Sequence, residues 1–163
     1  KKSCSQNYLI KPLNYHLPAK GGNDLKDKIT TFKLNWYDCG LCCADDVVQE
    51  EIIVYRNDNL LVFRELNRYG VICSCELIHI DSEAVNLFFS FLQDACGEWK
   101  SDYKVEVCDG SEWKVRMWHS SHKVTKICGT VEYPPHGKKI EKYIRSFIND
   151  GKSLIDPKLF GCS

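Results

Sequence analysis

The order of two hydrophobic periodicities constrains this chain most. Phe32, Leu34 and Trp36 alternate with polar residues, which is the period-two pattern of a half-buried strand. Related strand patterns recur at 51–56, 60–66 and 71–80, and after a helical stripe at 82–96 they return at 105–107, 113–118 and 124–133. A second amphipathic stripe at 138–150 follows. This order predicts an α+β fold of antiparallel meanders, about four plus three strands, with two principal helices packed on one side of the sheet.

Capping residues support both helices, and the length supports one domain. Asp81-Ser82 offers an N-cap to the first helix, Gly97 a terminator, and Gly151 a stop for the second helix. The 163 residues match the usual size of one domain, so we predict a single domain over 1–163. Within it, prolines and a Gly-Gly pair predict an irregular N-terminal arm at 1–28.

Charge and hydropathy argue against two classes of partner. The 22 basic and 22 acidic residues give a formal net charge of zero, without the basic excess that general nucleic-acid binding needs. No apolar stretch approaches the ~20 residues of a membrane-spanning helix. The basic start of the chain, 1–7, lacks the apolar core of a signal peptide. We therefore expect neither a nucleic-acid nor a membrane partner.

The ten cysteines favour reduced, structural thiols. Cys73 and Cys75 alternate with Ser74 in a strand pattern, where residues two apart share a face. Cys96 ends a helix pattern and Cys128 lies inside a strand pattern, positions that suit buried free cysteines. This usage predicts a cytoplasmic protein. A secreted, disulfide-bridged protein is the alternative, because the cysteine count is even.

Turn and core residues in the last third of the chain carry a resemblance. Asp109-Gly110 precedes Trp113, and Gly129 precedes Tyr133-Pro134 and a helix. The segment resembles small uncharacterised bacterial α+β proteins, mainly of Gram-positive type, that share a DG-x-x-W strand pair and a G…YP strand end. The resemblance implies a fold and carries no known activity.

The turn at 38–43, Asp-Cys-Gly-Leu-Cys-Cys, holds the candidate reactive residues. It is similar to the start of the bacteriocin-leader cysteine peptidases, a likeness that implies a nucleophilic role for Cys39. That family has a glutamine shortly before the cysteine and a helix on the nucleophile; 33–37 contains no glutamine, and 49–55 suits a strand. Cys39, Cys42 and Cys43 also have the spacing of half a zinc site, with His119-x-x-His122 as one possible source of further ligands. A disulfide within the turn is a third reading.

Aromatic residues indicate a contact surface. Trp113 and Trp118 have opposite strand parity, so one of them should face outward. An exposed tryptophan beside His119 is our candidate for that surface. Because no catalytic constellation is complete, we expect a non-enzymatic binding or interaction domain that acts through a protein partner. The alternative is a thiol peptidase-like enzyme or zinc-binding module that uses the 39–43 cysteines.

Overall fold

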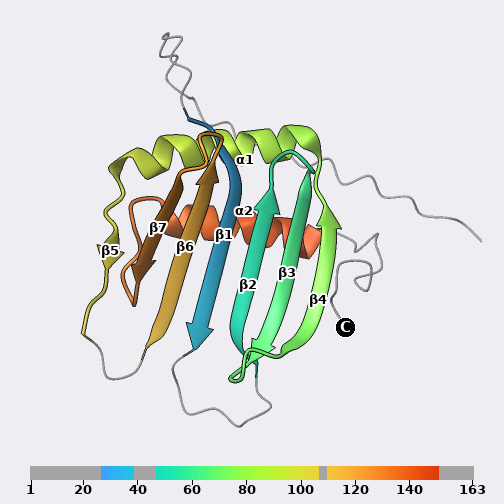
Figure 1. Cartoon of the computed structure of the whole chain (residues 1–163). Helices are drawn as coiled ribbons and strands as arrows, with labels where there is room; N and C mark the ends of the chain where they lie inside the picture. The colour runs from blue at the N-terminus through green and yellow to red at the C-terminus, as the bar shows by residue number, and fades with distance from the viewer. Residues whose placement is uncertain (1–26, 39–46, 107–109, 151–163) are drawn as a thin grey trace, which may run out of the picture.

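One mixed sheet organises the described part of the chain, in the strand order β4-β3-β2-β1-β6-β7-β5 (Figure 1). The computed structural model describes residues 27–38, 47–106 and 110–150. Its strands are β1 (Ile29–Asp38), β2 (Val47–Tyr55), β3 (Leu60–Asn67), β4 (Ile72–His79), β5 (Asp102–Tyr103), β6 (Ser111–His119) and β7 (Val124–Gly129). All neighbouring pairs are antiparallel except β5 and β7. The chain thus builds one half of the sheet, β1 to β4, before it builds the other.

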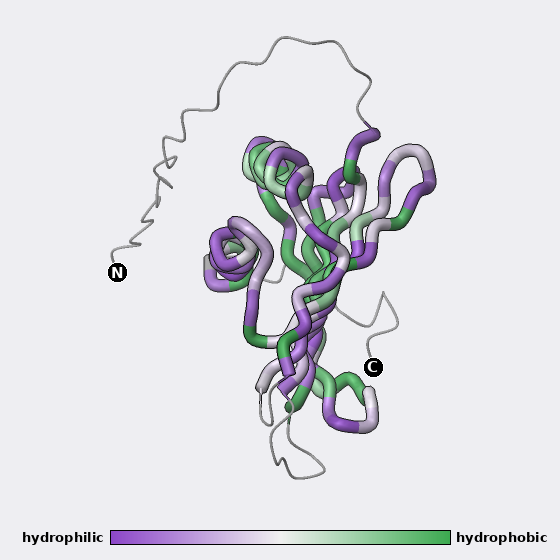
Figure 2. The backbone as a smooth tube through the Cα atoms, turned by 90° about the vertical axis from the view of Figure 1, so that its left-hand side faces the viewer, coloured by the Kyte–Doolittle hydropathy of each residue, from purple (hydrophilic) through white to green (hydrophobic). Residues whose placement is uncertain are grey.

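Both main helices lie on the same face of this sheet (Figure 2). Helix α1 (Ser82–Ala95) starts at its predicted cap, since the Asp81 side chain accepts hydrogen bonds from the Glu83 and Ala84 backbone N–H groups. A short 3-10 turn, η1 (Cys96–Glu98), follows it, and α2 (Gly137–Asp150) closes the described chain. The predicted α+β class with helices on one side is confirmed. Among the described helices, none is long and apolar enough to cross a membrane.

The principal core fills the space between helices and sheet. The Phe88 ring of α1 lies 5.6 Å from the Phe32 ring of β1 and 6.3 Å from the Phe147 ring of α2. Phe32, Phe88 and Phe89 are at most 1% exposed. Burying each such ring stabilises the fold by about 1.5–3 kcal/mol. The aromatic contacts therefore hold both helices and the central strand as one unit.

The second group of strands differs from the predicted hairpin. We expected 105–107 to pair with the strand at 113, but the observed strand is β5, which pairs in parallel with β7. The segment stays beside β7 because the Thr130 hydroxyl accepts from the Val105 N–H and donates to the Val105 carbonyl. Strand β7 ends at Gly129, four residues before the predicted end. The prediction was therefore wrong about the partner of this segment and about the length of β7.

The Trp113 ring joins the two motifs of the last third of the chain. Trp113 lies opposite Gly129 in the β6–β7 register, and its ring stacks on Tyr133 at a centroid distance of 5.9 Å. Its indole N–H donates to the Glu132 carbonyl at 2.9 Å. A Cβ on Gly129 would lie 2.3 Å from a Trp113 ring carbon, so only glycine leaves room for this ring. These motif residues form a packing unit.

The four described cysteines do not all have the redox state and burial that the sequence predicted. Cys73, Cys96 and Cys128 are free, as expected, but Cys75 is disulfide-bonded. Cys73 is exposed rather than buried, near the start of β4 and two residues from the exposed Val71. Cys96 behaves as a structural thiol: burial raises its pKa to about 12, and it donates a hydrogen bond to the Leu92 carbonyl. The expectation of a free, structural thiol is therefore wrong at Cys75.

Candidate functional site

The sheet face turned away from the helices carries most of the polar chemistry of the described chain. Alternation along β1 and β6 sends Phe32, Leu34, Trp113 and Val115 into the core and leaves their neighbours on this open face. No described helix lies on it (Figure 2). Its β2–β4 half holds a second apolar cluster of Ile53, Leu60, Val62 and Leu77, whereas its β1–β6–β7 half is polar.

Three cations cross the polar half in one row. Lys33 of β1 lies opposite Arg116 of β6, and Arg116 lies opposite Lys126 of β7. Adjacent strands are about 4.8 Å apart, so the row spans roughly 10 Å. Arg116 and Lys126 are exposed, and neither forms an ion pair with another described residue. Like charges directly opposite each other destabilise a strand pair, so this row is a local cost to the fold.

A shallow hollow of about 530 Å³ adjoins the row. Its rim includes two half-buried aromatic residues, Tyr55 of β2 and Trp118 of β6, which both pair with Thr31 of β1. Lys33 and His122 also line it. Trp113 is 1% exposed on the core side, so Trp118 is the outward-facing tryptophan that strand parity predicted. Tryptophan, tyrosine and arginine are the residues most often found at the energetic centre of protein interfaces, and here Arg116 lies in the row that adjoins the hollow.

Acidic residues limit the cationic zone along the strands. Glu51 is 7% exposed, forms ion pairs with Lys33 and Arg64, and accepts a hydrogen bond from Asn35 Nδ2 at 3.1 Å. Burial by itself raises the pKa of Glu51, but the hydrogen bonds from Lys33 and Asn35 and the charges of Lys33 and Arg64 lower it below its ordinary value. Further along, Lys114 pairs with Glu112 at 3.4 Å. Unneutralised positive charge is thus concentrated at Arg116 and Lys126.

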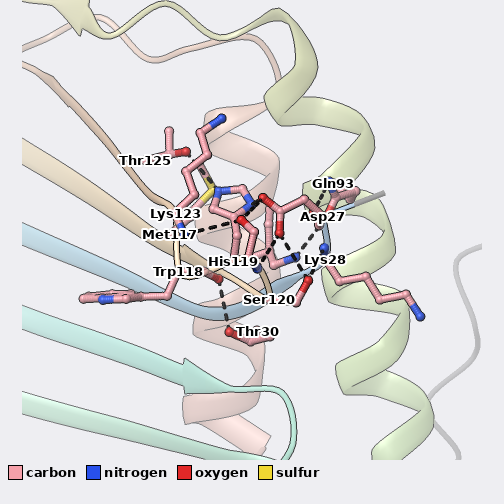
Figure 3. Close-up of polar contacts among 12 residues, drawn as sticks. Asp27, Lys28, Thr30, Gln93, Met117, Trp118, His119, Ser120, Lys123 and Thr125 are labelled. Atoms are coloured by element: carbon pink, nitrogen blue, oxygen red, sulfur yellow. Dashed lines mark hydrogen bonds and ion pairs between the residues drawn. The ribbon is translucent and has the colours of Figure 1, made fainter. Parts of the chain in front are cut away.

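A separate polar network surrounds the turn between β6 and β7 (Figure 3). The Asp27 carboxylate accepts hydrogen bonds from the Ser121 N–H at 2.8 Å and from the hydroxyls of Ser121 and Ser120 at 2.6 and 3.1 Å. The Ser121 side chain is the main reason that the pKa of Asp27 is lowered. Gln93 of α1 donates to the Asp27 carbonyl at 3.3 Å. The network therefore fixes the chain where it enters β1.

His119 belongs to this network. Its Nε2 lies 2.9 Å from the Thr125 hydroxyl, and its Nδ1 lies 3.6 Å from Asp27 Oδ2 without a hydrogen bond (Figure 3). A hydroxyl, imidazole and carboxylate in this order resemble a nucleophilic triad. Thr125, however, is not among the residues that line the hollow, so the hydroxyl has no site for a substrate there. We interpret the group as a structural clamp.

The predicted site in the cysteine turn falls outside the described part of the chain. Cys39, Cys42 and Cys43 lie outside the described residues, and their roles as nucleophile or zinc ligands remain predictions. In the described part of the chain, no three His, Cys, Asp or Glu side chains are grouped to hold a metal. His119 contacts the Asp27 network whereas His122, at φ 65°, is exposed beside the hollow, so the described pair does not converge on a metal.

Sequence reasoning found Trp118 but missed the cation row. The β6–β7 hairpin turn is centred on Ser121. Residues equally far from Ser121 on the two strands therefore pair, as Arg116 does with Lys126 and Trp118 with Val124. That symmetry was readable from the sequence. The contribution of Lys33 was not, because it depends on β1 lying beside β6. Searches against family models, curated proteins and solved structures found no match to this chain.

Proposed function

We propose that the protein is a non-enzymatic binding domain whose open sheet face takes an acidic segment of a protein partner. The row of Lys33, Arg116 and Lys126 beside the Trp118 hollow carries this proposal. Carboxylates of a partner would relieve the repulsion between Arg116 and Lys126. The half-buried indole of Trp118 and the exposed Val124 would supply apolar contact next to the charges.

The charge distribution favours a peptide over a nucleic acid. The cationic zone is one row deep, and the carboxylates of Glu51 and Glu112 lie in the rows beyond it. A phosphate backbone that continued along the strands would meet those carboxylates. Strong nucleic-acid binding needs many phosphate contacts, which this chain of zero net charge does not offer in one place. A few acidic side chains match the row better.

Fluorescence anisotropy with a labelled deca-glutamate peptide tests the proposal. We expect saturable binding that weakens as the salt concentration rises, because surface charge pairs are screened. Arg116→Glu should raise the Kd roughly tenfold, as expected for about 1.4 kcal/mol of lost attraction. Trp118→Ala should weaken binding without changing its salt dependence.

Lys142→Glu is the matched control, since it makes the same kind of charge reversal on α2 at the covered side of the sheet. Equal weakening by Lys142→Glu and Arg116→Glu would show a net-charge effect and refute the site. Tighter binding of a labelled deca-uridine RNA than of the peptide would refute the acidic-segment assignment. Absence of binding to the deca-glutamate peptide at low salt would also refute this assignment.

Two further predictions accompany this function. Membership of the Gram-positive family with DG-x-x-W and G…YP motifs remains a prediction from the sequence. Cytoplasmic location also remains a prediction, and the disulfide of Cys75 argues against it because cytosolic proteins rarely keep stable disulfides. Thiol titration of protein isolated with its thiols blocked would decide: most cysteines should react if the chain matures in a reducing compartment.

A further inference from the structure

Two aromatic side chains stand on either side of a small residue in the hollow of the open face. Tyr55 of β2 and Trp118 of β6 both pair with Thr31 of β1, which lies between them, and all three line the hollow. Neither aromatic ring contacts another ring of the described chain. The three residues therefore form a slot, the aromatic slot, with a ring on each side and a threonine at its floor.

The aromatic slot is wide enough for one planar ring. Two strand spacings separate its walls by about 10 Å, since side chains stand roughly perpendicular to a sheet. A ring halfway between them would lie about 5 Å from each wall, within the range of about 4.5–7 Å at which aromatic rings pair. Tyr55 and Trp118 are half-buried, and the Trp118 side chain points away from the Asp27 network (Figure 3). A ligand ring could therefore enter and contact aromatic surface on both sides.

The charges around the aromatic slot favour an anionic ligand. Lys33 and His122 line the hollow, and no described residue that lines it carries a carboxylate. The row of Lys33 and Arg116 lies two residues from the Thr31 row, or about 7 Å along the strands. Arg116 is exposed and forms no ion pair with another described residue. An anionic group at the end of a ring in the slot would therefore meet Arg116.

Among peptide side chains, a tyrosine ester combines the two features that the slot and the cation require. Its ring is flat, and its phosphate or sulfate group is attached at the end of the ring away from the peptide backbone. Arginine binds such oxyanions through two parallel hydrogen bonds. Glutamate has no ring and unmodified tyrosine has no charge, so neither of them would use both the slot and Arg116.

We propose that the aromatic slot binds a tyrosine ester, either phosphotyrosine or sulfotyrosine, with its ring between Tyr55 and Trp118 and its oxyanion on Arg116. This inference rests on the proposed function, because the modified tyrosine belongs to the acidic segment. Carboxylates that flank the tyrosine would contact Lys126, at the end of the same cation row. The two esters share the flat ring and the terminal oxyanion, so the slot is assigned to their common chemistry.

Fluorescence anisotropy with matched acidic peptides tests this inference and separates the two esters. The peptides are labelled deca-glutamate and three derivatives with a central tyrosine, phosphotyrosine or sulfotyrosine. At least one ester peptide should bind roughly tenfold more tightly than deca-glutamate and the tyrosine peptide, a gain that corresponds to about 1.4 kcal/mol. The tighter of the two esters identifies the source of the oxyanion. A peptide with a central phosphoserine carries the charge without the ring and should not reproduce this gain.

Substitutions in the aromatic slot should remove this gain and leave deca-glutamate binding unchanged. Thr31→Tyr fills the slot from its floor, and Tyr55→Ala removes one wall, whereas Tyr55→Phe keeps the wall and should keep the gain. Tyr37→Ala is the matched control: Tyr37 is another tyrosine of the sheet, its ring lies 4.7 Å from Lys114 Nζ, and it does not line the hollow. Thermal unfolding checks that each variant is folded before binding is compared.

The outcomes for the aromatic slot and for the acidic-segment function differ. Ester peptides that bind no more tightly than deca-glutamate would refute the slot and leave the proposed function intact. If neither deca-glutamate nor any ester peptide binds, the proposed function itself is wrong. An equal gain for the phosphoserine peptide, or an equal loss in Tyr37→Ala and Tyr55→Ala, would also contradict the slot. Stronger competition by adenosine monophosphate than by free phosphotyrosine and sulfotyrosine would assign the slot to a nucleotide and overturn the proposal.

Discussion

The two faces of the sheet use the same strands for opposite purposes. On the helix face, Phe32 and Trp113 are almost fully buried, and close packing leaves little freedom for substitution. On the open face, Lys33 and Arg116 lie opposite each other in the β1–β6 register; Arg116 is exposed, and Lys33 is half-buried and pairs with Glu51. Tight packing on the helix face stabilises the fold. The open face keeps an unfavourable arrangement of like charges. This contrast indicates that the open face is the side of the sheet that is suited to binding a partner.

Gly129→Ala should have the largest effect, because it tests the tight fit of the helix face. Its Cβ would overlap the buried Trp113 ring, which Tyr133 and a hydrogen bond to Glu132 hold in place. We expect a loss of about 3 kcal/mol in the free energy of unfolding, measured by urea denaturation. Gly97→Ala is the control, since a Cβ there meets nothing within 4 Å. Equal effects would show that Trp113 is not tightly held.

Glu51→Gln should have an intermediate effect, because Glu51 is the buried charge of the open face. The change leaves Lys33 and Arg64 without their carboxylate, and we expect a loss of about 1–2 kcal/mol at pH 7. Glu112→Gln is the matched control on the same face; its ion pairs are longer, at 3.4 and 3.9 Å, and more exposed, so it should cost less than about 0.5 kcal/mol.

The stability difference between wild type and Glu51→Gln depends on pH, and the direction of this dependence follows from the pKa of Glu51. The pKa of Glu51 is lowered by folding, so its contribution is fully present above the ordinary value of 4.5 and is lost as the pH falls through the lower folded pKa. Wild type and Glu51→Gln should therefore converge in stability as the pH falls below 4.5 and through the lowered pKa of folded Glu51. A gap that stays constant over this interval would contradict the role of the Glu51 charge.

Arg116→Thr should have the smallest effect and the opposite sign. Removing one of two like charges that face each other relieves repulsion, so the variant should be more stable by a few tenths of a kcal/mol at low salt. Lys126→Thr should behave alike, and the double variant should gain less than the two single gains together. The gain should shrink in high salt. Destabilisation by both single variants would show that the cation row supports the fold.

Local patterns allowed much of the fold to be predicted. Both helices were expected within one residue of their observed ends, since caps and apolar stripes are local features. Strands β1 and β6 followed from period-two alternation, and β2 to β4 followed from strand-forming runs separated by turns, although β2 begins at Val47, four residues before its predicted start. The outward direction of Trp118 followed from its parity with Trp113. Strand β5 was misplaced because two residues carry no periodic signal, and the side-chain hydrogen bonds of Thr130 place its segment beside β7.

The sequence by itself determined both helices, most of the strands and the side that their residues face, because those properties depend on neighbours along the chain. Only the tertiary structure decided that β1 lies beside β6, and this adjacency brings Lys33 into line with Arg116 and Lys126. It also placed Cys75 against an apolar cluster on the open face. Strand order is set by long-range packing of the two helices and seven described strands, and no local period encodes it.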